Sequence, residues 1–319
     1  MQRFVVNESE SGQTLEKYVR KVLKEAPLSF IYKLFRKKDV KVNGHWEKEK
    51  YVISKGEEIS IYITNEQLEE FKRNVVSTNN ANISSWIVYE DKNIIIINKP
   101  RGVLVQKDES NSLALDDMVI SYLSSKGEYD PNKDLGYKPA PSHRLDRNTA
   151  GLVIFGKNIL TLRYLSKIMQ DKNLITKKYL TLVKGKVDKG GVITSSLSKN
   201  SSNGRVFIDS NGKEAITKYE VKQVLDGYTL LEVTLLTGRT HQIRVHLASI
   251  SHPVIGDKKY GDYALNKEIE EKYGFKNQFL VSYYLEFNNL EEPLKYLSHK
   301  KYEIDLPIEC KELLLKLEE

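Results

Sequence analysis

The stretch that decides the fold of this chain spans residues 141–155. It reads Pro141-Ser142-His143-Arg144-Leu145-Asp146-Arg147-Asn148-Thr149-Ala150-Gly151, followed by Leu152-Val153-Ile154-Phe155. The apolar run predicts a buried strand over 151–155, and the polar residues before it predict a turn. Asp146 lies in that turn between Arg144 and Arg147, and positive charge nearby favours the ionised carboxylate. The pattern fits a surface ion pair or a carboxylate aimed at a substrate from a strand end.

Strands and helices alternate on both sides of this stretch. The expected strands span residues 83–90, 94–98, 178–183, 206–209, 215–224, 228–235 and 281–287. The expected helices span 113–125, 159–170 and 240–250, and Thr237 or Thr240 is the expected N-cap of the last one. Glycine turns between residues 206 and 235 predict an antiparallel meander. We therefore predict an α+β fold with a mainly antiparallel mixed sheet flanked by helices.

The first 75 residues read as a separate small α/β module. Helices are expected over 14–25 and 29–37, followed by a strand at 40–44 with an Asn-Gly turn and a strand at 58–63. The polar stretch 65–83 indicates a linker. We place the first domain at residues 1–75, the linker at 76–84 with the boundary near residue 80, and the larger domain at 85–319.

Composition narrows the class of protein. The net charge is +7 and the pI about 9.0, which suits a polyanionic partner without proving one. The single cysteine, Cys310, excludes an intrachain disulfide and a multi-cysteine metal site, and we interpret it as incidental. No apolar run reaches the roughly 18 residues that a membrane span needs, and the N-terminus shows no secretory signal. We expect a cytoplasmic protein that does not bind membranes.

Two further segments are rich in polar chemistry. Residues 236–247 join a strand to a helix, and Arg239 and Arg244 present planar forks suited to carboxylate or phosphate. His241 and His246 are five residues apart, which does not place two metal ligands on one helical face. The residues alone leave open whether this segment is functional or a capped helix start. Tyr179, in an expected strand, fits core packing or a platform for a stacked base.

These residues together resemble a known family. His143 to Arg147 with Thr149 to Leu152 resembles the signature of the RluA-type pseudouridine synthases. The other motifs of that family follow in order: Asn98-Lys99-Pro100 with Gly102, Lys178-Tyr179-Leu180, Thr237 through Leu247, and Gly256-Asp257-x-x-Tyr260-Gly261. The resemblance spans residues 85 to 290. The first module resembles an S4 RNA-binding domain.

The resemblance implies an isomerase that converts uridine in RNA to pseudouridine without a cofactor or a metal. Asp146 is then the reacting residue, which attacks C1′ or takes the C2′ proton. Arg244 pairs with Asp146, and Tyr179 lies against the uracil. Arg144 and Lys99 are expected to contact RNA near the site. The S4-like module is expected to bind phosphates through five cations: Lys33, Arg36, Lys37, Lys38 and Lys41.

The detailed sequence of the motifs resembles the subgroup that modifies large-subunit ribosomal RNA, so this RNA is the expected substrate. We also expect the enzyme to be bacterial and monomeric. Two alternatives stay open at this level. One is a tRNA substrate. The other is a non-catalytic assembly factor that binds RNA through the S4-like module, and an intact set of Asp146, Tyr179 and Arg244 argues against it.

Overall fold

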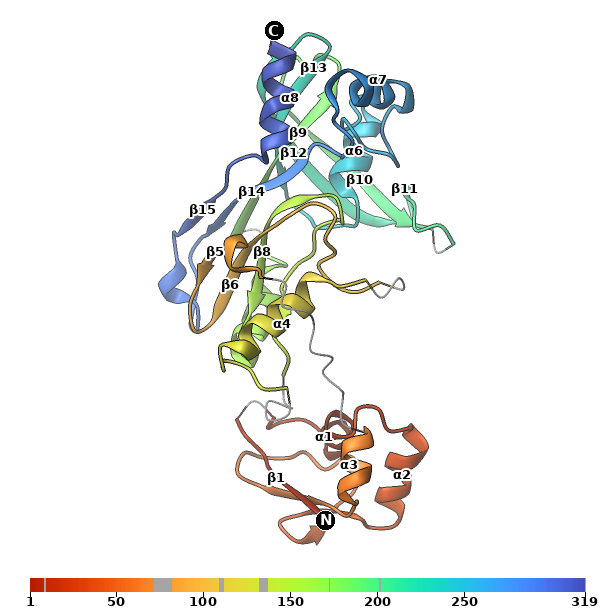
Figure 1. The fold of residues 1–319 in the computed structure, drawn as a ribbon, viewed down its shortest axis with the longest axis vertical. Coiled ribbons are helices and arrows are strands. Elements are labelled where there is room, and N and C mark those ends of the chain that lie inside the picture. The colour runs from red at the N-terminus through yellow and green to blue at the C-terminus, as the bar shows by residue number, and fades with distance from the viewer. Residues whose placement is uncertain are drawn as a thin grey trace. The chain divides into compact units, whose positions relative to one another are not determined.

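The computed structural model describes residues 1–8, 10–71, 82–108, 112–131, 137–171, 173–200 and 202–318. The chain divides into two compact units (Figure 1). The first comprises Met1–Ile83, Asp117–Ala140 and Gly156–Leu162, and the second comprises Ser84–Asp116, Pro141–Phe155 and Arg163–Glu319. The predicted boundary near residue 80 falls within 72–81, outside the described residues, so the proposed domain limits remain a prediction.

The N-terminal module is a four-stranded antiparallel sheet packed against helices, with strand order β1-β4-β2-β3. Its elements are β1 (Gln2–Val5), α1 (Leu15–Val22), α2 (Leu28–Arg36), β2 (Val40–Val42), β3 (His45–Trp46), β4 (Glu58–Ile61) and α3 (Asn65–Phe71). The Thr14 hydroxyl caps α1 by accepting from the Lys17 amide, and Asn43 and Gly44 adopt positive φ in the turn after β2. The helices and strands predicted for this module are confirmed.

The interpretation of residues 65–83 as a linker was wrong for its first part. Residues 65–71 form α3, whose Leu68 is buried in the core of the module. The Phe71 ring lies 4.8 Å from the Phe30 ring, so a short apolar face overrides the polar composition of this segment.

The second unit is built on an eleven-stranded mixed sheet with the order β11-β10-β12-β13-β9-β14-β8-β6-β5; β15 pairs with β14 and β7 with β8. The strands are β5 (Ile87–Glu90), β6 (Ile94–Lys99), β7 (Ala140–Pro141), β8 (Ala150–Gly156), β9 (Ile175–Lys184), β10 (Gly191–Lys199), β11 (Val206–Ile208), β12 (Lys213–Leu225), β13 (Tyr228–Leu235), β14 (Leu280–Phe287) and β15 (Lys301–Glu303). Only β14 and β8 pair in parallel among the registered pairs, which confirms the predicted fold class.

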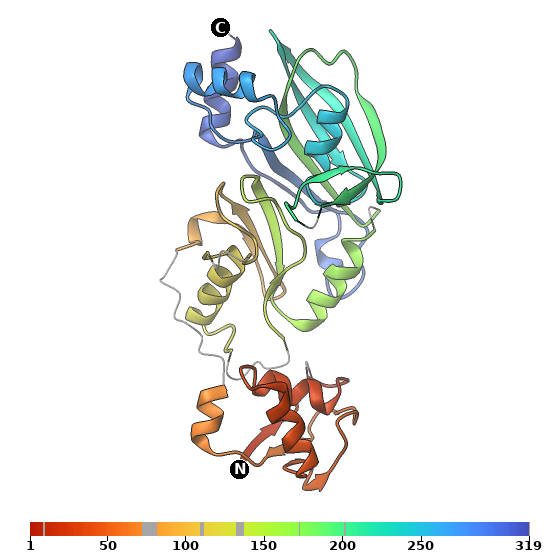
Figure 2. The same ribbon diagram turned by 90° about the vertical axis from the view of Figure 1, so that its right-hand side faces the viewer.

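Figure 2 shows the helices that follow the N-terminal module along the chain. They are α4 (Leu115–Ser125), α5 (Ile159–Ile168), α6 (Gln242–Ser249), α7 (Tyr263–Tyr273) and α8 (Ile308–Glu318), with the short 3-10 turns η1 (Ser84–Trp86) and η2 (Lys295–Leu297). One apolar cluster joins α5 to β6, β8 and β14. A second cluster joins α7 and α8 to β9, β13 and β14. Within the described residues, no helix has the length and apolar content to cross a membrane.

Several expected elements differ in detail. The strand expected at 83–90 begins only at Ile87, because Ser84–Trp86 forms η1. β10 was not predicted, since its serine-rich sequence buries only Ile193 and Leu197 as large apolar residues. Cys310 is not incidental: it is fully buried in the α8 core, where the Arg101 guanidinium donates to its sulfur at 2.9 Å.

The expected threonine caps of α6 were also wrong. The N-cap is His241 in the left-handed region at φ 53°, with no side-chain cap. The Thr237 hydroxyl instead accepts from the Ile216 amide at 2.8 Å and donates to the Gln242 side chain at 2.9 Å. Gln242 in turn donates to the Ile216 carbonyl at 3.0 Å, so the start of α6 is fastened to β12.

Candidate active site

Asp146 lies in the predicted turn before β8. The Thr149 amide donates to the Asp146 carbonyl at 3.1 Å, which closes the turn. The next carbonyl, that of Arg147, accepts from the Gly102 amide at 2.9 Å and from the Lys99 ammonium at 3.1 Å. The backbone on both sides of Asp146 is therefore held, while its side chain keeps 26% of its surface exposed. A held backbone with an accessible carboxylate suits a reacting group.

Gly151 explains why the motif requires a residue without a side chain. Its φ is +121°, and a Cβ at this position would lie 2.2 Å from the Ser282 carbonyl oxygen. Gly151 is in register with Ser282 in the parallel pair of β8 and β14. The close approach of these strands therefore sets the start of β8 and the turn that carries Asp146.

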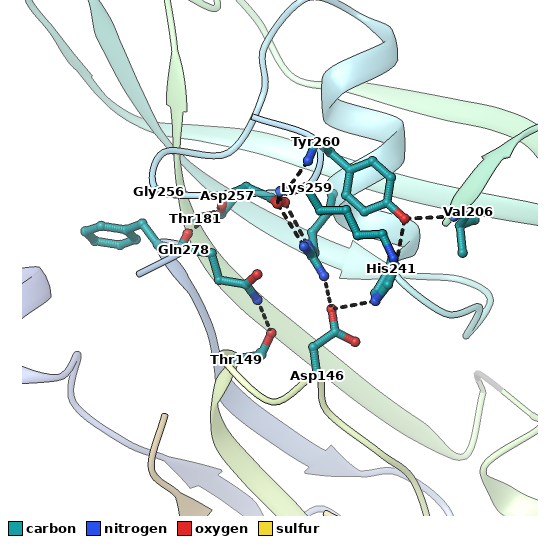
Figure 3. Close-up of polar contacts among 12 residues, drawn as sticks. Asp146, Thr149, Thr181, Val206, His241, Gly256, Asp257, Lys259, Tyr260 and Gln278 are labelled. Carbon is teal, nitrogen blue, oxygen red and sulfur yellow. Dashed lines mark hydrogen bonds and ion pairs between the residues drawn. The ribbon is translucent and has the colours of Figure 1, made fainter. Parts of the chain in front are cut away.

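Arg244, the second residue of the predicted pair, lies on α6 and donates to the carboxylates of Asp146 and Asp257, which are labelled in Figure 3. Its Nη1 donates to Asp146 Oδ2 at 2.8 Å. Its Nε and Nη2 donate to the two oxygens of Asp257 at 2.6 and 2.8 Å. Burial lowers the pKa of Arg244, but the hydrogen bond to Asp257 and the charges of both carboxylates outweigh it, so the pKa is raised and the guanidinium stays charged.

Asp257 anchors Arg244 from a loop after α6. Its side chain is fully buried, and its Oδ1 also accepts from the amides of Lys259 at 2.8 Å and Tyr260 at 3.1 Å. Burial raises the pKa of Asp257, whereas the hydrogen bond and the charge of Arg244 lower it. The lowering is larger, so the pKa of Asp257 lies below its ordinary value. Sequence analysis quoted Asp257 within a motif but gave it no role.

Tyr179, on β9, is 5% exposed and lines the same pocket as Asp146 and Arg244. Burial raises the pKa of Tyr179 to about 12; a hydrogen bond with Ser282 opposes this shift and the charge of Asp146 adds to it. The phenol is therefore neutral at ordinary pH. This open pocket is lined by Arg144, Leu145, Asp146, Thr149, Tyr179, Leu235, Arg239, His241, Gln242, Ile243, Arg244 and Leu280.

The structure thus brings together Asp146, Tyr179, Arg244 and Arg144, which sequence analysis took from three segments. Arg144 is exposed at the pocket. Sequence analysis missed His241, whose Nε2 lies 3.8 Å from Asp146 Oδ2. It also missed Tyr260, whose hydroxyl lies 2.8 Å from His241 Nδ1. Both residues were quoted in motifs, but their proximity depends on a loop that spacing does not fix.

The prediction that Lys99 lines the RNA groove was wrong. Lys99 is fully buried, and its ammonium donates to the carbonyls of Pro100, Val103 and Arg147 at 2.9, 2.8 and 3.1 Å. Burial lowers the pKa of Lys99 to about 7, although the charge of Asp146 opposes this shift. Three carbonyls match the three protons of an ammonium, so Lys99 ties its own loop to the Asp146 turn.

The five cations predicted to bind RNA lie on and after α2. Lys33, Arg36, Lys37 and Lys38 are exposed, and Lys41 is half-buried on β2. The Lys38 ammonium lies 5.2 Å from the centre of the Trp46 ring, and that of Lys41 lies 5.0 Å from the Tyr62 ring. Across the described part of the chain, no group of three or more His, Cys, Asp or Glu side chains is arranged to hold a metal ion.

Comparison with known proteins agrees with this geometry. Residues 93–249 match the family described as RNA pseudouridylate synthase. A protein of Mycoplasma capricolum, named an uncharacterized RNA pseudouridine synthase, is 32% identical over 307 residues, covering 94% of this chain and 96% of that protein. Ribosomal large subunit pseudouridine synthase D of Buchnera aphidicola is 31% identical over 316 residues, covering 96% and 95%.

Solved structures share the fold. Human RNA pseudouridylate synthase domain containing 4 superposes with a TM-score of 0.59 at 21% identity, covering 74% of this chain and 94% of that one. The chain belongs to the RNA pseudouridylate synthase family. It is therefore an RNA pseudouridine synthase, an isomerase that acts on RNA.

Proposed function

We propose that this enzyme modifies uridine in large-subunit ribosomal RNA and that Asp146 is the group that reacts at the ribose. The main support for the role of Asp146 is its ion pair with Arg244 at 2.8 Å, on the wall of a pocket that Tyr179 also lines. Relatives named ribosomal large subunit pseudouridine synthase C or D support the choice of RNA. A transfer RNA substrate is the competing outcome of the test below.

The reaction breaks the N1–C1′ bond and forms a C5–C1′ bond. Asp146 either attacks C1′ or removes the C2′ proton, and in both routes the uracil leaves with the electron pair of the N1–C1′ bond. The base turns and C5 bonds to C1′ as the Asp146–C1′ bond breaks or, in the other route, as the C2′ proton is returned; the C5 proton is then lost and N1 is protonated. No electron is gained or lost overall. Arg244 keeps Asp146 charged and oriented, and the neutral Tyr179 ring offers a surface for the uracil.

A paired uridine has to leave its helix to reach this pocket. Unstacking and unpairing cost a few kcal/mol, and less in a loop. Arg144 is placed two residues before Asp146 and is exposed at the pocket. We propose that it contacts the RNA backbone or fills the space that the flipped base leaves.

The N-terminal module is proposed to be an RNA-binding domain of S4 type. Residues 1–71 carry 13 Lys and Arg against 12 Asp and Glu, so the module is nearly neutral as a whole. Residues 33–41 carry five of these cations against Asp39 alone. A local basic patch on a neutral module favours binding to phosphate over a general attraction to acidic surfaces.

Aromatic rings accompany these cations. In the strand register, Lys41 pairs with Trp46 on one side and with Ser60 on the other, so their side chains share a face of the sheet, and Tyr62 follows Ser60 by two residues. Trp46 and Tyr62 are 40% and 42% exposed. A nucleotide brings a base for a ring and a phosphate for an ammonium, which matches the two lysine–ring pairs.

Replacement of Asp146 tests the catalytic proposal. Asp146→Asn keeps the shape of the side chain and removes its charge, and it should abolish tritium release from RNA that contains 5-tritiated uridine while RNA binding is retained. Asp188→Asn, in an exposed ion pair with Lys186, serves as the control. Normal tritium release by Asp146→Asn would refute the role of Asp146.

The RNA target is tested separately. Pseudouridine mapping in cells with and without this gene product should show the loss of one or more sites in large-subunit ribosomal RNA. Loss of sites only in transfer RNA would overturn the choice of substrate without affecting the role of Asp146.

A further inference from the structure

The two oxygens of Asp146 are held differently. Arg244 Nη1 donates to Oδ2 at 2.8 Å, and His241 Nε2 lies 3.8 Å from the same oxygen. Within the described residues, no group donates to Oδ1. In Figure 3 both dashed lines drawn from the Asp146 carboxylate, one of them to His241, start from the same oxygen. The carboxylate therefore has one engaged oxygen and one open oxygen.

A hydrogen-bond chain runs from the Val206 amide through the Tyr260 hydroxyl to His241. The Val206 amide donates to the Tyr260 hydroxyl oxygen at 2.8 Å. The Tyr260 hydroxyl has one proton, and the available acceptor is His241 Nδ1 at 2.8 Å. When the hydroxyl donates to Nδ1, a neutral His241 carries its proton on Nε2, the nitrogen that faces Asp146.

We propose that His241 is a positioning residue that holds an N–H on Nε2 toward Asp146 Oδ2, so that Oδ1 is the oxygen that forms the new bond at the ribose. This inference rests on the proposed role of Asp146. Oδ1 bonds to C1′ or to the C2′ proton, and the electron pair of the broken N1–C1′ bond leaves with the uracil. The 3.8 Å separation is long for a hydrogen bond, so the proposal requires this contact to shorten in the substrate complex.

The surroundings of His241 support its neutral form. Burial lowers the pKa of His241, the charge of Asp146 opposes this shift, and the charges of Arg244 and Lys259 add to it. Burial also raises the pKa of Tyr260, so its hydroxyl keeps the proton that it donates. The charged or titratable groups that face His241 are Asp146, Arg244, Asp257, Lys259 and Tyr260.

The proton position can be observed directly. Nitrogen-15 NMR of histidine-labelled full-length protein distinguishes the two imidazole tautomers, and the spectrum of His241→Gln identifies the His241 signals among those of the six histidines. We expect Nε2 to be protonated and Nδ1 to be an acceptor at pH 7.5. Tyr260→Phe should raise the pKa of His241, because the lost hydroxyl stabilised the neutral ring. A proton on Nδ1 in the wild-type protein would overturn the proposal.

Two replacements separate this role from a backbone role. His241 has φ 53°, a conformation that Asn tolerates better than Gln does. The Gln side chain can place an N–H near the position of Nε2, whereas the shorter Asn side chain cannot. A donor role predicts that His241→Asn lowers kcat by about 3- to 10-fold with little change in KM, and that His241→Gln retains more of the activity. A purely conformational role predicts the opposite order, which would refute the proposal.

Tyr263→Phe is a matched control for Tyr260→Phe. Tyr263 lies three residues further on, is 84% exposed and has no part in the site, so its replacement should leave both the His241 signals and kcat unchanged. If the tautomer is as expected but Asp146→Asn remains active, the role of Asp146 fails while the proton assignment stands. If Asp146→Asn is inactive and the Asn and Gln variants keep the wild-type kcat, the positioning role fails alone.

Discussion

Asp257→Asn is the sharpest test of how the site is built. The Asp257 carboxylate is buried and receives four donors, two from Arg244 and one each from the amides of Lys259 and Tyr260. Asn replaces one oxygen with an amide NH2 group, which has to face a donor. It also removes the charge that balances a guanidinium shielded from water.

The expected magnitude follows from these contacts. Removing one partner of a buried ion pair costs about 3–5 kcal/mol of unfolding free energy. For a domain of this size that corresponds to a melting temperature lower by roughly 6–20 °C. Arg244 then no longer holds Asp146 in place. Loss of that charge-assisted hydrogen bond, worth about 1.5–3 kcal/mol, lowers kcat by roughly 10- to 150-fold.

Thermal unfolding and tritium release measure the two effects. Asp262→Asn is the control, because Asp262 pairs with Lys184 at the surface and caps α7, where Asn serves equally well. A melting temperature and a kcat for Asp257→Asn that match those of Asp262→Asn would refute the reasoning.

The same variant should alter the response to acid. The folded-state pKa of Asp257 lies below its ordinary value. Its contribution to stability is therefore complete above the ordinary carboxyl pKa and is lost as the pH falls through the lower folded-state pKa. The difference in unfolding free energy between the wild type and Asp257→Asn should shrink as the pH is lowered through that range.

Three further predictions concern the supports of the site and the N-terminal module. Gly151→Ala should cost about 3 kcal/mol or more in denaturant unfolding, because its Cβ would lie 2.2 Å from the Ser282 carbonyl oxygen, whereas Gly227→Ala, with open space, should cost less. Lys99→Met should release the Arg147 carbonyl and lower kcat about tenfold, measured by tritium release. Trp46→Ala should weaken RNA binding by about 1–3 kcal/mol equally at every salt concentration, whereas Lys41→Ala should flatten the salt dependence; the reverse pattern in binding titrations would contradict the stacking proposal.

Local sequence patterns predicted the strands around the site well, but they did not predict the contacts between the side chains of the site. The apolar run after Gly151 forms β8, which is buried along its whole length, because an apolar run of that length has few other stable placements. The pairing of Asp146 with Arg244 joins residues 98 positions apart. Periodicity carries no information across such a distance, so only the resemblance to a family suggested that pair.

Lys99 shows why the supporting contacts were not predictable. A lysine at the end of a strand is most often exposed, and the expected contact of Lys99 with RNA assumed that exposure. Its burial depends on three carbonyls from residues 100, 103 and 147 that meet only when two turns pack together. The role of His241 was not predictable for a similar reason. Its sequence neighbours suggested a capped helix start, whereas its left-handed backbone and its contact with Tyr260 depend on a loop that follows α6.

The division of Arg244 between two carboxylates explains how one site can be both rigid and reactive. Asp257 takes the paired edge of the guanidinium, Nε and Nη2, and is buried, so it fixes the position of Arg244. Asp146 is bound through Nη1 instead, which donates to a single carboxylate oxygen. Had Asp146 taken the paired edge, both of its oxygens would be engaged and neither would be open to a ribose. The buried Asp257 therefore fixes the position of Arg244, and the half-exposed Asp146 keeps one oxygen available to react.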